Sequence, residues 1–156
     1  MLAAQGYQES QLNQKAKSHV GAIGVMQIMP ATGAQLNVGD IQITEPNIHA
    51  GAKYMDQLMT KHFLDATFVE GNRPLFAFAS YNAGPARISR MRKIATARSL
   101  DANQWFNNVE VVTAEKIGIE TTTYVRNIYK YYVAYKLTLE QMELQQEMKD
   151  RLRKGG

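Results

Sequence analysis

The apolar run at positions 75–79, Leu-Phe-Ala-Phe-Ala, is the feature that most constrains the fold of this chain. Pro74 precedes the run, and Asn82, Gly84 and Pro85 follow it closely. Proline is favoured in the first turn of a helix and glycine just past its end, so these residues predict a helix that ends near Asn82. Because a helix that is apolar on every side is buried on every side, the rest of the chain has to surround it.

The remaining sequence also predicts helices, because no strand-like alternation of apolar and polar residues persists, whereas helix start and stop signals recur. Pro30 suits the first turn of a short helix, and Thr44 and Pro46 mark the start of another. The predicted apolar face of this second helix consists of Ile48, Ala52, Met55 and Met59. We therefore expect a mostly α fold with a central buried helix.

The length of 156 residues favours a single domain with one core of ordinary size. A long helix is predicted from about Thr121, and its apolar positions continue to Leu139. Residues 140–156 are rich in charge and poor in core-type side chains. We expect a folded domain over residues 1–139 and a charged C-terminal helical extension or tail over residues 140–156.

Composition excludes several kinds of site. The chain has no cysteine, which excludes disulfides and thiolate metal sites. His19, His49 and His62 lack the spacing of a metal motif, so we expect no metal and no cofactor. A net charge of +4 favours an anionic partner, and nucleic acid, acidic lipid and peptidoglycan all qualify. We expect no nucleic acid, because binding it would need a basic face with base-reading side chains, which the sequence does not show.

The start of the chain bears on its location. No apolar run approaches the roughly 20 residues that cross a bilayer, and no signal peptide is present. The sequence already reads as a helix from Met1, close before Glu9. We interpret this start as a boundary cut into a longer protein. Any export signal, lipid anchor, membrane attachment or further domain would then lie upstream of Met1.

Glu9 is the strongest candidate for chemistry. It lies just upstream of a glycine-bearing apolar loop that contains Val25, Met26, Ile28 and Met29. A carboxyl group held against such side chains loses hydration, and this raises its pKa toward the range where it can donate a proton at neutral pH. An isolated glutamate at a helix end is usually a surface residue, so the sequence context of Glu9 carries the argument.

That context includes several motifs. They are Glu-Ser-x-Leu-Asn at 9–13, Ala-x-Ser at 16–18, Gly-Ala-x-Gly-Val-Met-Gln-Ile-Met-Pro-x-Thr at 21–32, Ala-Ser-Tyr-Asn-Ala-Gly-Pro at 79–85 and Glu-Thr-Thr-Thr-Tyr-Val-Arg-Asn-Ile at 120–128. Together they resemble the soluble lytic transglycosylase domain. The resemblance implies a lysozyme-like fold with a substrate cleft, which cleaves bacterial peptidoglycan. Residues 71–74 and the long segment 85–120 most resemble the membrane-bound transglycosylases that carry a solute-binding-type domain before the catalytic one.

The resemblance assigns roles to individual residues. It implies that Glu9 is the sole catalytic acid and base, that Ser18 binds the reacting sugar, and that the hydroxyl of Tyr81 lies near Glu9. The other positions that it implies for substrate binding are Gln27, Met29, Asn82, Glu120 and Tyr124.

Residue types alone leave alternatives open for these positions. Ser18 also suits a turn or cap, and the Gln27 amide can be satisfied either by a sugar or by the backbone. Tyr81 and Asn82 also suit helix termination and core packing. The chain departs from the family pattern in size at Leu12, Val25, Gly33 and Ser80, which bears on subsites more than on activity.

The implied reaction depends on how many carboxylates take part. A two-carboxylate glycosidase needs a second Asp or Glu about 5–9.5 Å from the acid. The motifs around Glu9 and Tyr81 contain none, and Glu120 is the only other carboxylate that a family motif brings near the cleft. We therefore expect cleavage of the bond from N-acetylmuramic acid to N-acetylglucosamine with Glu9 alone, which leaves 1,6-anhydro ends.

Two other functions stay open. A goose-type lysozyme-like hydrolase would use the same acid with water as nucleophile. A non-catalytic peptidoglycan-binding module would be expected to have lost Glu9, which is present. The resemblance further implies glycan strands of peptidoglycan as the partner and a location in the periplasm or cell envelope of a bacterium, and we expect a monomer.

Overall fold

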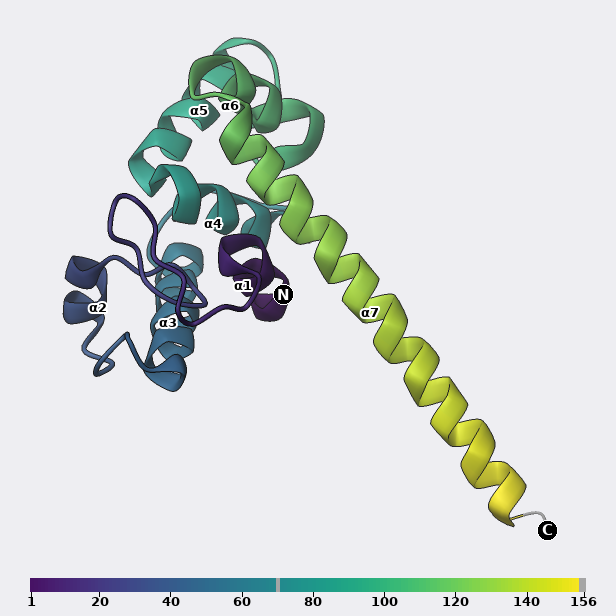
Figure 1. Cartoon of the computed structure of the whole chain (residues 1–156). Coiled ribbons are helices and arrows are strands. Elements are labelled where there is room, and N and C mark those ends of the chain that lie inside the picture. The colour runs from purple at the N-terminus through teal and green to yellow at the C-terminus, as the bar shows by residue number, and fades with distance from the viewer. Residues whose placement is uncertain (70, 155–156) are drawn as a thin grey trace.

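Helix α4 (Asn72–Ala83) lies among the other helices and packs against α3, α5 and α7, as its apolar sequence predicts (Figure 1). The computed structural model describes residues 1–69 and 71–154. Six consecutive residues of α4, from Leu75 to Ser80, are buried. The helix begins two residues before Pro74, which is compatible with proline in the first turn. The central buried helix is therefore confirmed.

The other elements are also helical. They are α1 (Leu2–Ser10), α2 (Pro30–Leu36), α3 (Thr44–Thr60), α5 (Pro85–Ala97), the irregular turn η1 (Trp105–Val109), α6 (Glu110–Lys116) and α7 (Ile119–Lys154). In the described part of the chain no strand forms, and extended pairing is limited to two isolated bridges, Lys17 with Ile23 and Ile23 with Ile28. Helix α6 was not predicted.

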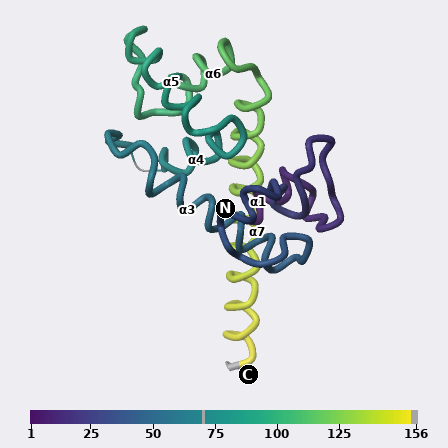
Figure 2. The backbone as a smooth tube through the Cα atoms, turned by 90° about the vertical axis from the view of Figure 1, so that its left-hand side faces the viewer, coloured from purple at the N-terminus to yellow at the C-terminus, as the bar shows by residue number. Residues whose placement is uncertain are grey.

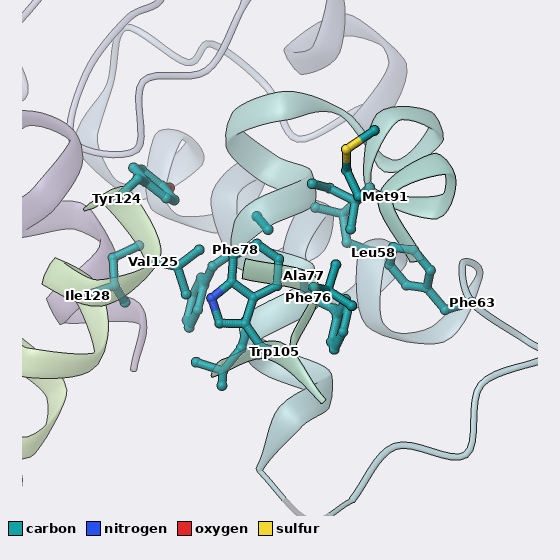
Figure 3. Close-up of a cluster of buried hydrophobic side chains, with 14 of the residues drawn as sticks. Leu58, Phe63, Phe76, Ala77, Phe78, Met91, Trp105, Tyr124, Val125 and Ile128 are labelled. Carbon is teal, nitrogen blue, oxygen red and sulfur yellow. The ribbon is translucent and has the colours of Figure 1, made fainter. Parts of the chain in front are cut away.

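The main core surrounds α4 with side chains from α3, α5, η1, α6 and α7 (Figure 3). Trp105 is fully buried, and its ring meets Phe76 of α4 edge to face with centroids 5.5 Å apart. On its other side Phe76 stacks on Phe68 at 4.6 Å. Tyr124 and Val125 close this core from α7, so the helix that carries Tyr124 is held by its packing on α4.

A second, smaller core lies between the loop after α1 and helices α2 and α3, and its buried residues include Val25, Met26 and Ile28. The predicted apolar face of α3 is wrong by about one residue, because Ile48 is exposed whereas Asn47 and Gly51 are buried. A search for an apolar helix face omits Asn47 because its side chain is polar. Its amide nevertheless bonds the backbone of Met26 in the loop. Gly51, which has no side chain, lets Met26 approach the backbone of α3.

Helix α7 runs past the domain and extends alone beyond it (Figures 1 and 2). Residues 140–153 are all exposed, yet they continue the same helix without a break. The domain boundary at residues 139 and 140 therefore stays a prediction. None of the described helices is both long and apolar enough to cross a membrane.

Candidate active site

Glu9 lies in the last turn of α1, where the chain leaves the helix through a left-handed residue, Gln11. Ser10 ties this helix end to the following loop, because its hydroxyl donates to the carbonyl of Val25 at 2.9 Å. Burial raises the pKa of Glu9 from 4.5 to about 7, and a hydrogen bond from Tyr124 acts in the opposite direction. At neutral pH the carboxyl group is therefore close to half protonated, as its sequence context predicts.

Tyr124 is the direct partner of Glu9. Its hydroxyl donates to Oε1 of Glu9 at 2.5 Å, although the two residues are 115 positions apart. The same hydroxyl oxygen accepts a hydrogen bond from Nε2 of Gln5 at 3.2 Å. A phenol has one proton to donate. Because Gln5 donates to the hydroxyl oxygen and does not accept from it, the proton of Tyr124 remains available for Glu9.

Tyr81 lies in the last turn of α4. Its hydroxyl donates to the carbonyl of Met26 at 2.7 Å and so anchors the loop to the central helix. Burial raises the pKa of Tyr81, and the charge of Glu9 raises it further, which places the phenol within the field of the carboxylate. Tyr81 therefore stays protonated, and its closeness to Glu9 stays a prediction.

Asn47 holds the loop from the side of α3. Its Oδ1 accepts from the backbone N–H of Met26 at 2.8 Å, and its Nδ2 donates to the carbonyls of Ile23 and Ile41 at 2.8 and 2.9 Å. All the hydrogen-bonding capacity of this buried amide except one lone pair is thereby used for backbone groups. Tyr81 and Asn47 together fix Met26 and its neighbours on both sides.

The loop residues that were assigned to substrate make local contacts. Ser18 accepts from the N–H of Ala22 at 3.0 Å, so it has the turn role that its residue type allows. Gln27, whose φ is 47°, donates to the carbonyls of Ala16 and Gly24 at 3.3 and 2.9 Å. Neither side chain bonds Glu9 within the described chain. The backbone therefore satisfies the amide group of Gln27, and its carbonyl oxygen remains for another donor.

A hollow of about 150 Å³ opens beside these residues. Its lining consists of Gln27, Ile28, Met29, Thr32, Tyr54 and Tyr81. Met29 is exposed, and the rings of Tyr54 and Tyr81 lie 5.1 Å apart. A larger apolar hollow of about 510 Å³ lies between the start of α1 and α7, but its lining contains no carboxylate. The lining of the smaller hollow contains no carboxylate either, but it includes Tyr81, whose pKa the charge of Glu9 raises, and so the smaller hollow is the candidate site.

Asn82 and Glu120 lie on the α7 side. Oδ1 of Asn82 accepts from the Thr121 hydroxyl at 2.7 Å, which ties the end of α4 to the first turn of α7. Glu120 is exposed in that turn and makes no contact with Glu9 in the part of the chain that the structure describes. Tyr124 therefore contacts Glu9 directly. Asn82 instead bonds Thr121, which lies on the same helix as Tyr124.

Residues 1–106 match the family model described as the transglycosylase SLT domain. This chain belongs to that family. Among relatives of this SLT chain, membrane-bound lytic murein transglycosylase F of Thiobacillus denitrificans is 34% identical over 145 residues, and that of Desulfosudis oleivorans is 33% identical. The alignments cover 85% of this chain but 30% and 32% of those proteins. The chain spans about a third of the length of the curated relatives it matches.

Solved SLT structures confirm the predicted lysozyme-like helical fold. An inactive variant of lytic transglycosylase Slt from Pseudomonas aeruginosa, in which a glutamate is replaced by glutamine, superposes with a TM-score of 0.67 at 28% identity. The 70 kDa soluble lytic transglycosylase of Escherichia coli superposes with a TM-score of 0.65 at 29% identity. They cover 89% and 87% of this chain and 21% of each longer chain.

Sequence reasoning missed Gln5 and Asn47 in this SLT domain. Both are polar and fully buried, and both act on other site residues rather than on a substrate. One signal for Gln5 was available, because it precedes Glu9 by four residues and so shares its helix face. No local signal distinguished Asn47 from a surface asparagine near a helix start. Among the described residues no three potential metal ligands cluster.

Proposed function

We propose that this chain is the catalytic domain of a peptidoglycan lytic transglycosylase, in which Glu9 is the single general acid and base. The observation that carries the proposal is the pKa of Glu9, raised by burial to about 7. A catalytic acid is most effective when its pKa lies near the working pH. Membership of the SLT family supports the reaction class and peptidoglycan as substrate.

In the first step, the protonated carboxyl of Glu9 donates its proton to the oxygen that links N-acetylmuramic acid to N-acetylglucosamine. The bond from this oxygen to the anomeric carbon breaks, and the carbonyl oxygen of the muramic acetamido group stabilises the positive charge on that carbon. Glu9 is left as a carboxylate. The hydrogen bond from Tyr124 stabilises this charged form, because the hydroxyl donates to Oε1.

In the second step, the Glu9 carboxylate takes the proton from the C6 hydroxyl of the same muramic residue. The C6 oxygen bonds to the anomeric carbon, the acetamido oxygen is released, and a 1,6-anhydro ring forms. Glu9 regains its proton, so no water is consumed. The attacking hydroxyl is tethered to the reacting ring, which gives it a high effective concentration.

The absence of a second acid supports this route over hydrolysis. The shift in the pKa of Glu9 has two causes, burial and Tyr124, and no other carboxylate of the described chain is among them. A retaining hydrolase needs a carboxylate nucleophile, and an inverting hydrolase needs a carboxylate base. The lack of a second carboxylate among these causes supports a route that needs neither.

We place the substrate cleft along the hollow lined by Gln27, Met29 and Tyr81. The free carbonyl oxygen of Gln27 can accept from a sugar hydroxyl, and exposed Met29 offers an apolar surface to a sugar face. Ser18 is proposed to bind the reacting sugar, and Asn82, Glu120 and Tyr124 are proposed to bind the glycan strand. Peptidoglycan glycan strands in a bacterial cell envelope are the corresponding partner and location.

Product analysis tests this function. Purified peptidoglycan digested with this chain should release fragments that end in 1,6-anhydro-muramic acid, each one water lighter than the hydrolysis product and inert to borohydride. Reducible ends, or oxygen incorporated from labelled water, would instead identify a lysozyme-like hydrolase, and Glu120 would be the first carboxylate to test. Binding without release of fragments would identify a non-catalytic module.

A further inference from the structure

Three cationic side chains converge on one hollow away from Glu9. The hollow has a volume of about 340 Å³ and is lined by Arg87 and Arg90 of α5, by Lys116 at the end of α6, and by Met91 and Ile117. Helices α5 and α6 pack against each other, so the two arginines and the lysine reach the hollow from separate elements (Figure 1). No acidic residue takes part in the lining.

The two arginines have no protein partner in the part of the chain that the structure describes. Within residues 1–69 and 71–154, neither Arg87 nor Arg90 donates a side-chain hydrogen bond or forms an ion pair, and both are exposed. Arg92 of the same helix differs sharply, because it is buried and binds Asp65, Asn103 and the carbonyl of Ala102. Arg92 is therefore structural, whereas Arg87 and Arg90 are free to bind an external group.

The position of Arg87 on α5 is also electrostatically unfavourable. Helix α5 begins at Pro85, so Arg87 lies in the first turn, where the helix dipole favours acidic side chains. The first turn of α5 contains no acidic residue. Positive charge placed against the local preference is typical of residues kept for binding rather than for stability. Lys116 is less informative, because a cation in the last turn of α6 is favoured by the dipole.

The hollow is built by segments that continue directly from residues of the proposed catalytic centre. Arg87 follows Asn82 by five residues, and Lys116 precedes Thr121 by five. Asn82 and Thr121 are hydrogen-bonded to each other, and Tyr124 lies three residues after Thr121, about 4.5 Å farther along the axis of α7. The turn from α4 into α5 and the turn from α6 into α7 therefore link the residues of the hollow to the Asn82–Thr121 pair and, along α7, to Tyr124.

We propose that Arg87 and Arg90 bind the carboxylates of the peptide stems that peptidoglycan carries on its muramic residues. The proposal rests on the proposed function. A glycan strand that reacts at Glu9 carries anionic peptides on its muramic residues, and the cationic hollow is formed by segments that continue from the site. Guanidinium groups suit this ligand, because they form paired hydrogen bonds with carboxylates. The apolar lining of Met91 and Ile117 suits the aliphatic parts of a peptide.

The test compares two substrates and two double variants. The substrates are glycan strands with their peptides and the same strands after an amidase has removed them. The first variant is Arg87→Gln with Arg90→Gln. The control is Lys93→Gln with Lys149→Gln, which removes the same charge from exposed positions, one of them lining a different hollow beside α5. Melting temperatures of both variants should match the parent, because the changed side chains are exposed.

The arginine variant should lose about tenfold in kcat/KM on peptide-bearing strands, the effect of one or two charged hydrogen bonds, and nothing on stripped strands. The control should match the parent on both. Equal losses on both substrates, or no loss on either, would overturn the proposal while leaving the proposed function intact.

A binding measurement separates the proposal from the activity. By calorimetry, the tripeptide L-alanyl-γ-D-glutamyl-meso-diaminopimelic acid should bind the parent and the control but not the arginine variant, and the same peptide with amidated carboxyls should bind none of them. If the parent cleaves neither substrate, the proposed function fails. The binding measurement would still show whether the hollow binds the peptide. No difference between parent and arginine variant would overturn the peptide site.

Discussion

At the scale of single residues, burial and one hydrogen bond act on the pKa of Glu9 in opposite directions. Burial favours the protonated acid, which is the form needed to cleave a glycosidic bond. The Tyr124 hydroxyl favours the carboxylate, which is the form needed to take up a proton afterwards. One carboxyl group can therefore serve both steps, because neither protonation state is strongly disfavoured at neutral pH.

The first prediction concerns the pH dependence of this acid. Because the free protein must hold a proton on Glu9, kcat/KM should be level below pH 7 and fall about tenfold per pH unit above it. Glu9→Gln should reduce turnover by at least about 10²-fold at pH 6. Glu143→Gln, at an exposed position of α7, is the matched control and should retain parental activity. An unchanged rate in Glu9→Gln would exclude Glu9 as the acid.

Gln5 is predicted to act through Tyr124. Gln5→Leu should leave the free energy of unfolding nearly unchanged, because the lost donor bond is offset by removal of an Oε1 that lacks a partner in the described structure. Without Gln5, Tyr124 is free to turn its proton away from Glu9. The midpoint of the pH profile should therefore move to higher pH. A profile identical to that of the parent would show that Gln5 only packs.

At the scale of elements, the site depends on how closely α3 approaches the loop that contains Met26. A β-carbon added at Gly51 would lie 2.6–2.8 Å from the Cγ, Cε and Cβ atoms of Met26. Met26 cannot withdraw easily, because Asn47 and Tyr81 hold its backbone from two sides. The glycine on α3 is thus part of the support of the loop.

Gly51→Ala should therefore destabilise the fold by about 1–3 kcal/mol, the usual cost of overpacking a core. Gly6→Ala is the matched control on α1. There the added carbon would meet the side-chain ends of Val25 and Leu12 at 3.0 and 3.1 Å, which can give way. Chemical denaturation should rank Gly51→Ala below Gly6→Ala in stability. The reverse order would mean that the loop adjusts more readily than its hydrogen bonds indicate.

The exposed end of α7 is a second test at this scale. Residues 140–153 bury nothing against the domain, so a chain that ends at Leu139 should keep its free energy of unfolding within about 0.5 kcal/mol of the parent. Its activity should also be unchanged. A large loss of stability would show that the domain extends beyond residue 139.

At the scale of the whole molecule, the raised pKa of Glu9 links activity to stability. Below pH 4.5 the carboxyl group is protonated in both the folded and the unfolded chain, so its ionisation does not change the free energy of unfolding. As pH rises from 4.5 to 7, the unfolded chain loses this proton while the folded chain keeps it. Folding stability therefore falls with pH and reaches its full penalty above pH 7.

Glu9→Gln should accordingly be more stable than the parent by about 3 kcal/mol at pH 8, and no more stable at pH 4. Unfolding by denaturant at pH 4, 6 and 8 would measure the difference, with Glu143→Gln as the control that shows none. A gap independent of pH would mean that the shift does not come from ionisation of Glu9. The trade between stability and activity is common at catalytic sites.

The sequence by itself determined the helical class, the central position of residues 75–79 and the raised pKa of Glu9. These follow from local signals, since an all-apolar helix has to be buried and an acid beside an apolar loop loses water. The motifs around Glu9 and Tyr81 were sufficient for the family. The substrate roles of Ser18, Gln27 and Glu120 stay predictions.

Only the tertiary structure decided which side chains meet. The Tyr124–Glu9 bond joins positions 115 residues apart, and neither a residue pattern nor the resemblance, which assigned Tyr124 to the substrate, had suggested it. The sequence could not predict that Asn47 is buried or which face of α3 packs inward. A pattern of apolar residues treats an amide side chain as polar even where it is buried. The two free arginines of α5 could be told from structural Arg92 only by their partners. Hydrogen bonds and burial depend on packing between distant segments, and local sequence carries no direct record of that packing.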